Sequence, residues 1–117
     1  MKIKALENLF TLHHKVTIYV PATVDVDKEV DNSVQVDAAA ALLSGLFGGA
    51  TSSPAVGYWL TSSGKLVKEK TTIVFAFAPE NALESGIDEI VDFCDKLKAE
   101  MAQEAIALEV DGSMYFI

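Results

Sequence analysis

Residues 65–78 read KLVKEKTTIVFAFA, and this stretch decides the fold. Its second half, Thr72 to Ala78, is apolar on both faces, which is typical of a central strand covered by helices on at least one face. Pro79 ends the strand, because proline cannot donate to a sheet ladder. The sequence then changes to helical spacing, with Asn81 or Ser85 as the N-cap and an end near Ala102. The apolar stripe of this helix is Leu83, Ile87, Ile90, Val91, Cys94, Leu97 and Met101.

Shorter patterns on either side predict the other elements. Alternating apolar residues indicate half-buried strands. A helix with Asn32 or Ser33 at its start ends at Gly48 and Gly49, because glycine readily adopts the left-handed conformation at a helix exit. Asp111-Gly112 is a two-residue hairpin turn. The remaining expected elements are strands at Lys15–Val20, Ala55–Thr61, Ala105–Val110 and Ser113–Ile117, and a helix at Val36–Phe47.

The order of these elements is β-α-β-β-α-β with one added C-terminal strand. It predicts a single ferredoxin-like α+β domain over residues 1–117, with an antiparallel sheet and both helices on one face. The other face must be covered or hydrated. The apolar C-terminal strand Met114–Ile117 would invite association if it lay bare on a sheet edge. We therefore expect a homodimer or a protein partner.

Composition excludes several classes of function. The chain has a net charge of −8 and no arginine. Its negative electrostatic field repels the phosphates of a nucleic acid, and it lacks the bidentate hydrogen-bond donors of arginine, so nucleic-acid binding is disfavoured. A single cysteine, Cys94, permits no internal disulfide, and no Cys/His cluster has zinc spacing. The acidic residues 25–31 lack the glycine and glutamate of a calcium loop and indicate a solvated loop. No signal peptide or membrane span is present in the sequence, and we expect a cytoplasmic protein without a metal or cofactor.

Candidate site residues gather between Phe47 and Glu69. Glu69 stands inside a predicted strand, where glutamate is disfavoured. It is either a general base or ligand carboxylate beside Trp59, or the partner of a lysine across an exposed sheet face. Trp59, with Tyr58 beside it, is either a stacking or interface residue or part of the core. Thr51 with the two glycines is either an anion nest or a structural helix exit.

His13, His14 and Cys94 are further candidates for metal binding or catalysis. His13 and His14 are adjacent, so on a strand they point to opposite faces and cannot share a metal; one histidine with a distant carboxylate remains an alternative. Cys94 lies on the apolar stripe of the second helix, which indicates a small buried side chain and not a nucleophile.

The chain resembles a set of small uncharacterised bacterial and phage proteins. The resemblance rests on a helix that ends in Phe-Gly-Gly-x-Thr, a Gly-x-Trp strand, a glycine turn and a strand with a glutamate. The matching residues are Phe47, Gly48, Gly49, Thr51, Gly57, Trp59, Gly64 and Glu69, with a weaker match at residues 103–106. It covers roughly residues 43–108. It implies a ferredoxin-like fold and an origin in a mobile genetic element, and it implies no activity.

High apolarity, acidic charge and the lack of a catalytic constellation favour a non-catalytic binding or interaction protein. One alternative is a small enzyme or ligand-binding domain with a cleft around Glu69 and Trp59. Another is an acidic decoy that mimics DNA.

Overall fold

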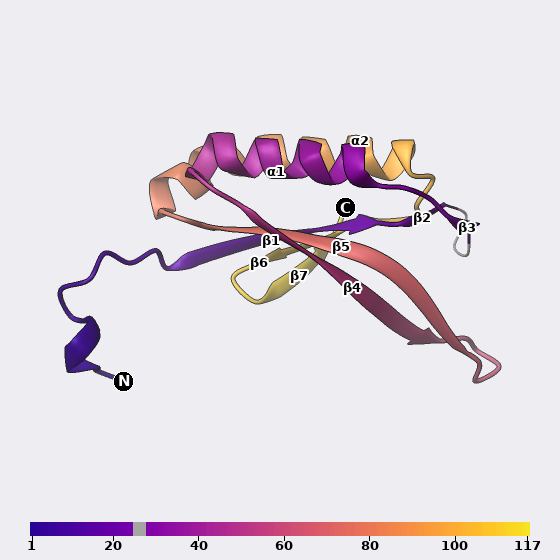
Figure 1. Ribbon diagram of the computed structural model, residues 1–117, viewed down its shortest axis with the longest axis horizontal. Helices are drawn as coiled ribbons and strands as arrows, with labels where there is room; N and C mark the ends of the chain where they lie inside the picture. The colour runs from indigo at the N-terminus through magenta and orange to yellow at the C-terminus, as the bar shows by residue number, and fades with distance from the viewer. Residues whose placement is uncertain (25–27) are drawn as a thin grey trace.

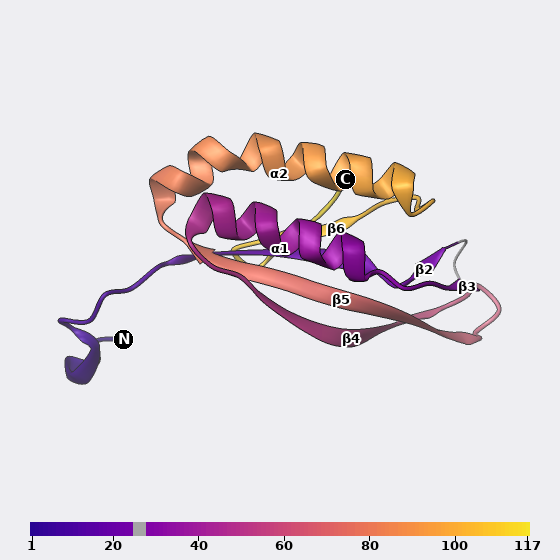
Figure 2. The same ribbon diagram turned by 45° about the horizontal axis from the view of Figure 1, so that its top comes forward.

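The computed structural model describes residues 1–24 and 28–117 and has an α+β fold. Two helices lie side by side on one face of a five-stranded antiparallel sheet, whose strand order is β4-β5-β1-β6-β7 (Figures 1 and 2). The ferredoxin-like arrangement with an added C-terminal strand is thus confirmed. The elements are β1 (His14–Pro21), α1 (Ser33–Phe47), β4 (Thr51–Leu60), β5 (Leu66–Ala78), α2 (Glu80–Glu100), β6 (Ala107–Val110) and β7 (Ser113–Phe116).

Both helices begin earlier than the sequence predicted. α1 begins at Ser33, three residues before the expected Val36, and its N-cap is Asn32, one of the two caps predicted. The side-chain amide of Asn32 donates to the carbonyl of Val20 at 3.3 Å. The N-cap of α2 is Pro79, so the expectation of Asn81 or Ser85 was wrong. Proline fits there because its fixed φ suits a residue that enters a helix, and its carbonyl accepts a bond from the Leu83 amide at 3.0 Å.

A small two-stranded ribbon precedes α1 and was not predicted. It consists of β2 (Thr23–Val24) and β3 (Lys28–Glu29). Glu29 in this ribbon forms an ion pair with Lys70 of β5 at 3.0 Å. The acidic residues Asp25 and Asp27, weighed above as part of a calcium loop, lie outside the described residues.

The core lies between the helices and the sheet. Alternate residues of β1 and β5 point toward the helices and are buried, because side chains alternate across a strand. Gly86 of α2 allows α1 to approach closely, since a Cβ atom there would lie 3.2 Å from the Leu46 side chain. The largest fully enclosed side chains among the described residues are Val16, Ile18, Val20, Leu43, Val74, Ile90, Cys94, Ile106 and Leu108. In the described part of the chain, neither helix has the length and apolarity needed to cross a bilayer.

Candidate functional site

The hairpin of β4 and β5 extends past the helices and leaves the core (Figure 1). The two strands pair continuously from Thr51 opposite Phe75 to Leu60 opposite Leu66. β4 therefore begins four residues earlier than predicted, because the long β5 offers it a partner along its whole length. Both sides of the outer half of the hairpin are exposed or only half-buried. This projecting half carries most of the candidate residues.

Glu69 lines a cleft of about 190 Å³ between the hairpin and the chain that enters β6. The cleft is bounded by Tyr19, Pro21, Thr23, Gly57, Glu69, Lys70, Thr71, Gln103, Ala105, Ile106 and Ala107. Its wall is held by side-chain hydrogen bonds: the Gln103 amide donates to the Thr23 carbonyl at 2.8 Å, and the Thr71 hydroxyl donates to the Val20 carbonyl at 2.9 Å. These polar groups are committed to the scaffold. Glu69 forms no ion pair with any residue that the structure describes.

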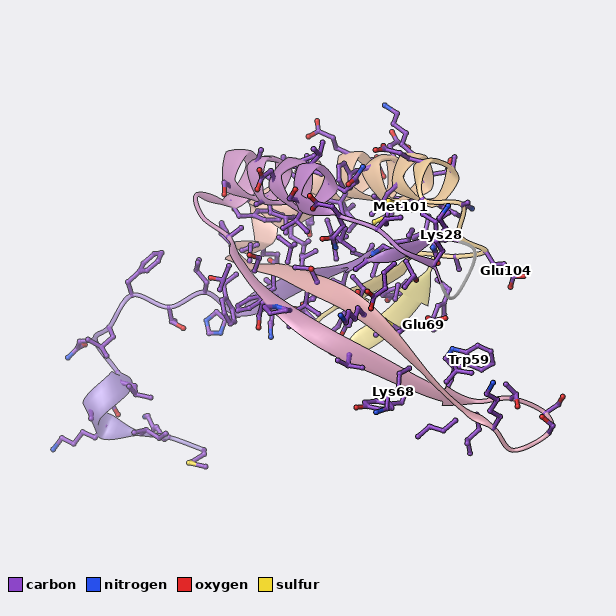
Figure 3. All side chains as sticks on the ribbon, turned by 45° about the vertical axis from the view of Figure 1, so that its right-hand side comes forward. Lys28, Trp59, Lys68, Glu69, Met101 and Glu104 are labelled. Atoms are coloured by element: carbon purple, nitrogen blue, oxygen red, sulfur yellow. The ribbon has the colours of Figure 1, made fainter. Side chains whose placement is uncertain are left out.

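The position of Glu69 contradicts its interpretation as a partner of a cross-strand lysine. The residue opposite Glu69 is Gly57, which has no side chain. Lys68 and Lys70 point to the other side of β5 by alternation, as Figure 3 shows for Lys68. Lys70 pairs with Glu29, and the Lys68 ammonium lies 5.9 Å from the centre of the Tyr58 ring. The glutamate therefore faces a recess, not a lysine.

Trp59 lies on the same side of the hairpin as Glu69 (Figure 3). Its cross-strand partner is Val67, two residues before Glu69, and its side chain is 45% exposed. The interpretation of this tryptophan as a core residue was therefore wrong. Trp59 lies outside the lining of the cleft, farther along the same side of the hairpin. A half-exposed indole at this place can stack on a planar ring that extends from the cleft, while the carboxylate holds a cation.

Tyr58 and Thr51 are not part of this arrangement. Tyr58 points to the opposite side of the hairpin from Glu69, with 59% of its surface exposed. Thr51 pairs with Phe75, six strand positions from Gly57, which corresponds to about 20 Å. It borders a separate apolar hollow of about 450 Å³ beside Gly48 and Gly49. Gly48 has a φ of +95°, which confirms the structural helix exit.

A histidine–carboxylate pair lies at the far end of the sheet, and it is the alternative that the sequence left open without naming the carboxylate. The His14 Nδ1 donates to an Asp111 carboxylate oxygen at 2.6 Å, and the Lys15 amide donates to the other oxygen at 2.8 Å. His14 Nε2 is 3.9 Å from Glu80. The only signal in the sequence was the Asp111-Gly112 turn, whose two positive φ values let it fold back onto β1. Among the described residues, no group of three or more ligands has the geometry of a metal site.

Mutual interaction shifts the pKa of both members of this pair. The hydrogen bond to Asp111 raises the pKa of His14, and the bonds from His14 and from the Lys15 amide lower the pKa of Asp111. The raised histidine pKa stabilises the fold below the ordinary value near 6.5, and this contribution is lost as the pH rises through the folded pKa. The lowered aspartate pKa stabilises it above about 3.9, and this contribution is lost as the pH falls through the folded pKa. The His14–Asp111 pair therefore makes its full contribution to stability only between about pH 3.9 and about pH 6.5.

We predict that Asp111→Asn lowers the melting temperature more at pH 5.5 than at pH 8.5. Asparagine also tolerates the positive φ of this turn, so the substitution removes the charge and keeps the backbone. Thermal unfolding of both proteins at the two pH values measures the difference. An equal loss at both values would show that the turn geometry, and not the ion pair, stabilises this corner.

Cys94 is buried on the core side of α2, and burial raises the pKa of its thiol to about 11. A thiol that remains protonated at neutral pH is a poor nucleophile. This agrees with its interpretation as a small core side chain.

No protein-family model and no curated protein matches the sequence. Two solved structures are similar in fold. A phage SAM lyase in complex with S-methyl-5′-thioadenosine has a TM-score of 0.65 and 18% identity, with 96% of this chain and 94% of that chain covered. A phage SAM lyase in its apo state has a TM-score of 0.66 and 17% identity, with 95% and 93% covered. The likeness establishes the shared fold.

These neighbours correct the functional interpretation of the sequence. The expectation of a non-catalytic binding protein is contradicted, because both solved structures described above share this fold over nearly their whole length and are lyases. The expectation rested on the absence of a known catalytic constellation. A single carboxylate in a cleft has no sequence signature, so that absence was a poor criterion.

Proposed function

We propose that the protein is a small enzyme that cleaves S-adenosylmethionine and releases S-methyl-5′-thioadenosine, at the cleft around Glu69 and Trp59. The observation that carries the proposal is the likeness in fold, over 96% of this chain, to a SAM lyase solved with S-methyl-5′-thioadenosine. The alternative of a small enzyme at this cleft, inferred from the sequence, agrees with that likeness. The acidic decoy has no comparable support.

The chemistry of the cleft suits this substrate. S-adenosylmethionine carries a positive sulfonium and a positive α-ammonium, and Glu69 brings a negative charge into the recess. Among the described residues Glu69 forms no ion pair, and the cation that also lines the cleft, Lys70, is paired with Glu29. Release of S-methyl-5′-thioadenosine breaks the bond between the sulfur and the γ-carbon of the methionine moiety, and the electron pair stays on the sulfur. The carboxylate of the same methionine moiety forms the new bond to the γ-carbon, so the four-carbon fragment leaves as a lactone. Glu69 holds and orients the cationic part of the substrate. The product thioether is neutral, so its weaker attraction to the carboxylate favours its release.

The sulfonium itself explains why so few polar groups are needed. A sulfonium is a good leaving group, so the protein need not supply a metal ion or a nucleophile–base pair to activate it. The protein then has to bind the substrate in a reactive conformation and exclude other conformations. A carboxylate, an aromatic ring and a fixed wall are sufficient for this task.

The cleft of one chain is smaller than most small-molecule sites, which measure roughly 300–1,000 Å³. The outer hairpin also exposes apolar side chains on both sides: Trp59 lies on the side of Glu69, and Val56, Tyr58 and Leu60 lie on the opposite side. We propose that a second copy of the chain packs against the hairpin and completes the cleft. This extends the expectation of self-association from the C-terminal strand to the hairpin.

The direct test is to incubate the purified protein with S-adenosylmethionine and follow S-methyl-5′-thioadenosine by liquid chromatography and mass spectrometry. The proposed four-carbon product is a lactone, closed on its own carboxylate, and the alternative is an unsaturated amino acid that has lost a proton to a base. These two are isomers of equal mass, so proton NMR of the reaction mixture distinguishes them. Light scattering on the same sample gives the number of chains. Absence of turnover, together with no thermal stabilisation by S-methyl-5′-thioadenosine, would overturn the proposal.

Trp59→Ala should weaken binding of S-methyl-5′-thioadenosine by about tenfold, because stacking of a base on an aromatic side chain contributes roughly 1–3 kcal/mol. The melting temperature should change little, since the indole is half-exposed. Isothermal titration measures the affinity. The matched control is Trp59→Phe, which keeps an aromatic face and should retain most of the binding. Equal losses in the two variants would contradict stacking.

A further inference from the structure

Residues 1–13, called the arm below, project away from the sheet (Figures 1 and 2). The arm contains one short 3₁₀ turn at Lys4–Leu6 and presents its large apolar side chains to solvent. Phe10 is 89% exposed and Leu9 is 60% exposed. Each such side chain gains about 1.5–3 kcal/mol when it is buried. The exposed apolar residues after Met1 are Ile3, Leu6, Leu9 and Phe10.

The spacing of these residues is that of one helical face. Ile3, Leu6 and Phe10 follow the i, i+3, i+7 pattern of a helix that binds in a groove, and Leu9 adjoins them. A turn already exists at this point, with the Leu6 amide bonded to the Ile3 carbonyl at 3.0 Å. A helix of about ten residues is marginal in water and requires a partner surface to form fully.

An apolar groove lies elsewhere on the molecule, between α2 and β7. It has a volume of about 240 Å³ and is lined by Ile87, Val91, Leu108, Val110, Tyr115 and Ile117. β7 is an edge strand of the sheet, so its outer side is unpaired within the chain. We name this surface the α2–β7 groove.

The charges of the two surfaces are complementary. Glu84 and Asp88 are exposed on α2 beside the residues that line the α2–β7 groove. The arm carries Lys2 and Lys4 against one acidic residue, Glu7, whereas the chain as a whole has a net charge of −8. The cationic arm is thus attracted to the acidic residues beside the groove. This local attraction opposes the repulsion between two chains that each carry a net negative charge.

We propose that the arm of one chain binds in the α2–β7 groove of a second copy of this chain. The arm continues outward from β1 and away from its own helices, so it presents its apolar side to another molecule (Figure 1). Exchange of two arms between two copies gives a closed, symmetric contact in which each chain both supplies an arm and receives one. This contact is separate from the hairpin and does not depend on the proposed enzyme activity.

Directed disulfide formation tests the placement of the arm. A Leu6→Cys protein, activated as a mixed disulfide with a small aromatic thiol, is combined with a Val91→Cys protein whose thiol is free. The matched control is Glu89→Cys, which is exposed on the same helix away from the groove. We expect the covalent dimer with Val91→Cys to form at least about tenfold faster than with Glu89→Cys, because docking raises the effective concentration. Native Cys94 interferes little, since burial raises the pKa of its thiol to about 11.

Charge reversal provides the second measurement. Lys4→Glu should slow the coupling to Val91→Cys, and Glu84→Lys in the receiving chain should restore it. Equal rates at positions 91 and 89 would overturn the proposal. An internal disulfide formed in dilute solution by a chain with both cysteines, faster than coupling between chains, would also overturn it, because the arm would then occupy its own groove.

Discussion

Replacing Glu69 with glutamine should lower the rate of S-adenosylmethionine cleavage by about a hundredfold or more. The substitution keeps the size of the side chain and removes the negative charge that faces the cationic substrate. Loss of one preorganised electrostatic contact in an active site commonly costs a factor of about 10² to 10³ in rate. Steady-state assays of product formation measure the change. Affinity for the neutral product should change far less than affinity for the substrate.

The control for this variant is Glu109→Gln. Glu109 lies in β6 opposite Thr17, on the same sheet face as Glu69 but outside the lining of the cleft. We expect it to retain full activity. We also expect Glu69→Gln to melt within about 2 °C of the unsubstituted protein, because no ion pair among the described residues depends on Glu69. A large loss of stability, or equal losses of activity in both variants, would assign Glu69 to the architecture and not to the site.

Ile18→Ala should destabilise the fold by about 3 kcal/mol or more. Ile18 is fully buried in β1 between its cross-strand partners Val74 and Leu108, beneath both helices. Truncation of an enclosed isoleucine removes transfer free energy and leaves a cavity, and such changes cost about 2–5 kcal/mol. This is a large share of the roughly 5–15 kcal/mol by which a typical domain is stable. Urea unfolding followed by circular dichroism measures the difference.

Val56→Ala is the matched control, since Val56 is an apolar strand residue of the outer hairpin with 48% of its surface exposed. Its cost should stay below about 1 kcal/mol. Equal losses at positions 18 and 56 would mean that the hairpin belongs to the cooperative core. That result would contradict the separation between core and site described here.

The elements of this fold could be predicted because their signals are local. The apolar half of β5, the stripe of α2 and the Asp111-Gly112 turn each indicate one type of structure over a short window. The order of the elements then restricted the topology to a ferredoxin-like sheet. Boundaries were less predictable where a partner decided them: β4 extends to Thr51 only because β5 is long enough to pair with it.

The candidate site was only partly predictable, because its members meet through pairings between distant segments. Glu69 stood out because a charged residue is unusual inside a strand. Gln103, which forms part of the cleft wall, lies in the segment between α2 and β6. Its position therefore depends on how β6 pairs with β1. Thr51 seemed to belong with Glu69 because both lie in one glycine-rich stretch, yet an extended chain separates them. Closeness in sequence is a poor guide to closeness in space within a long strand.

β5 serves two purposes along its thirteen residues. From Lys70 onward it is bonded to β1 and to the chain that follows β1, whereas from Leu66 to Glu69 it pairs with β4 alone. Substitutions in this outer part can therefore accumulate without threatening folding, and natural selection or an engineer can vary what this end recognises at little risk. A small domain thus gains a surface that can change in sequence, because β5 is longer than the part of the sheet that the helices cover.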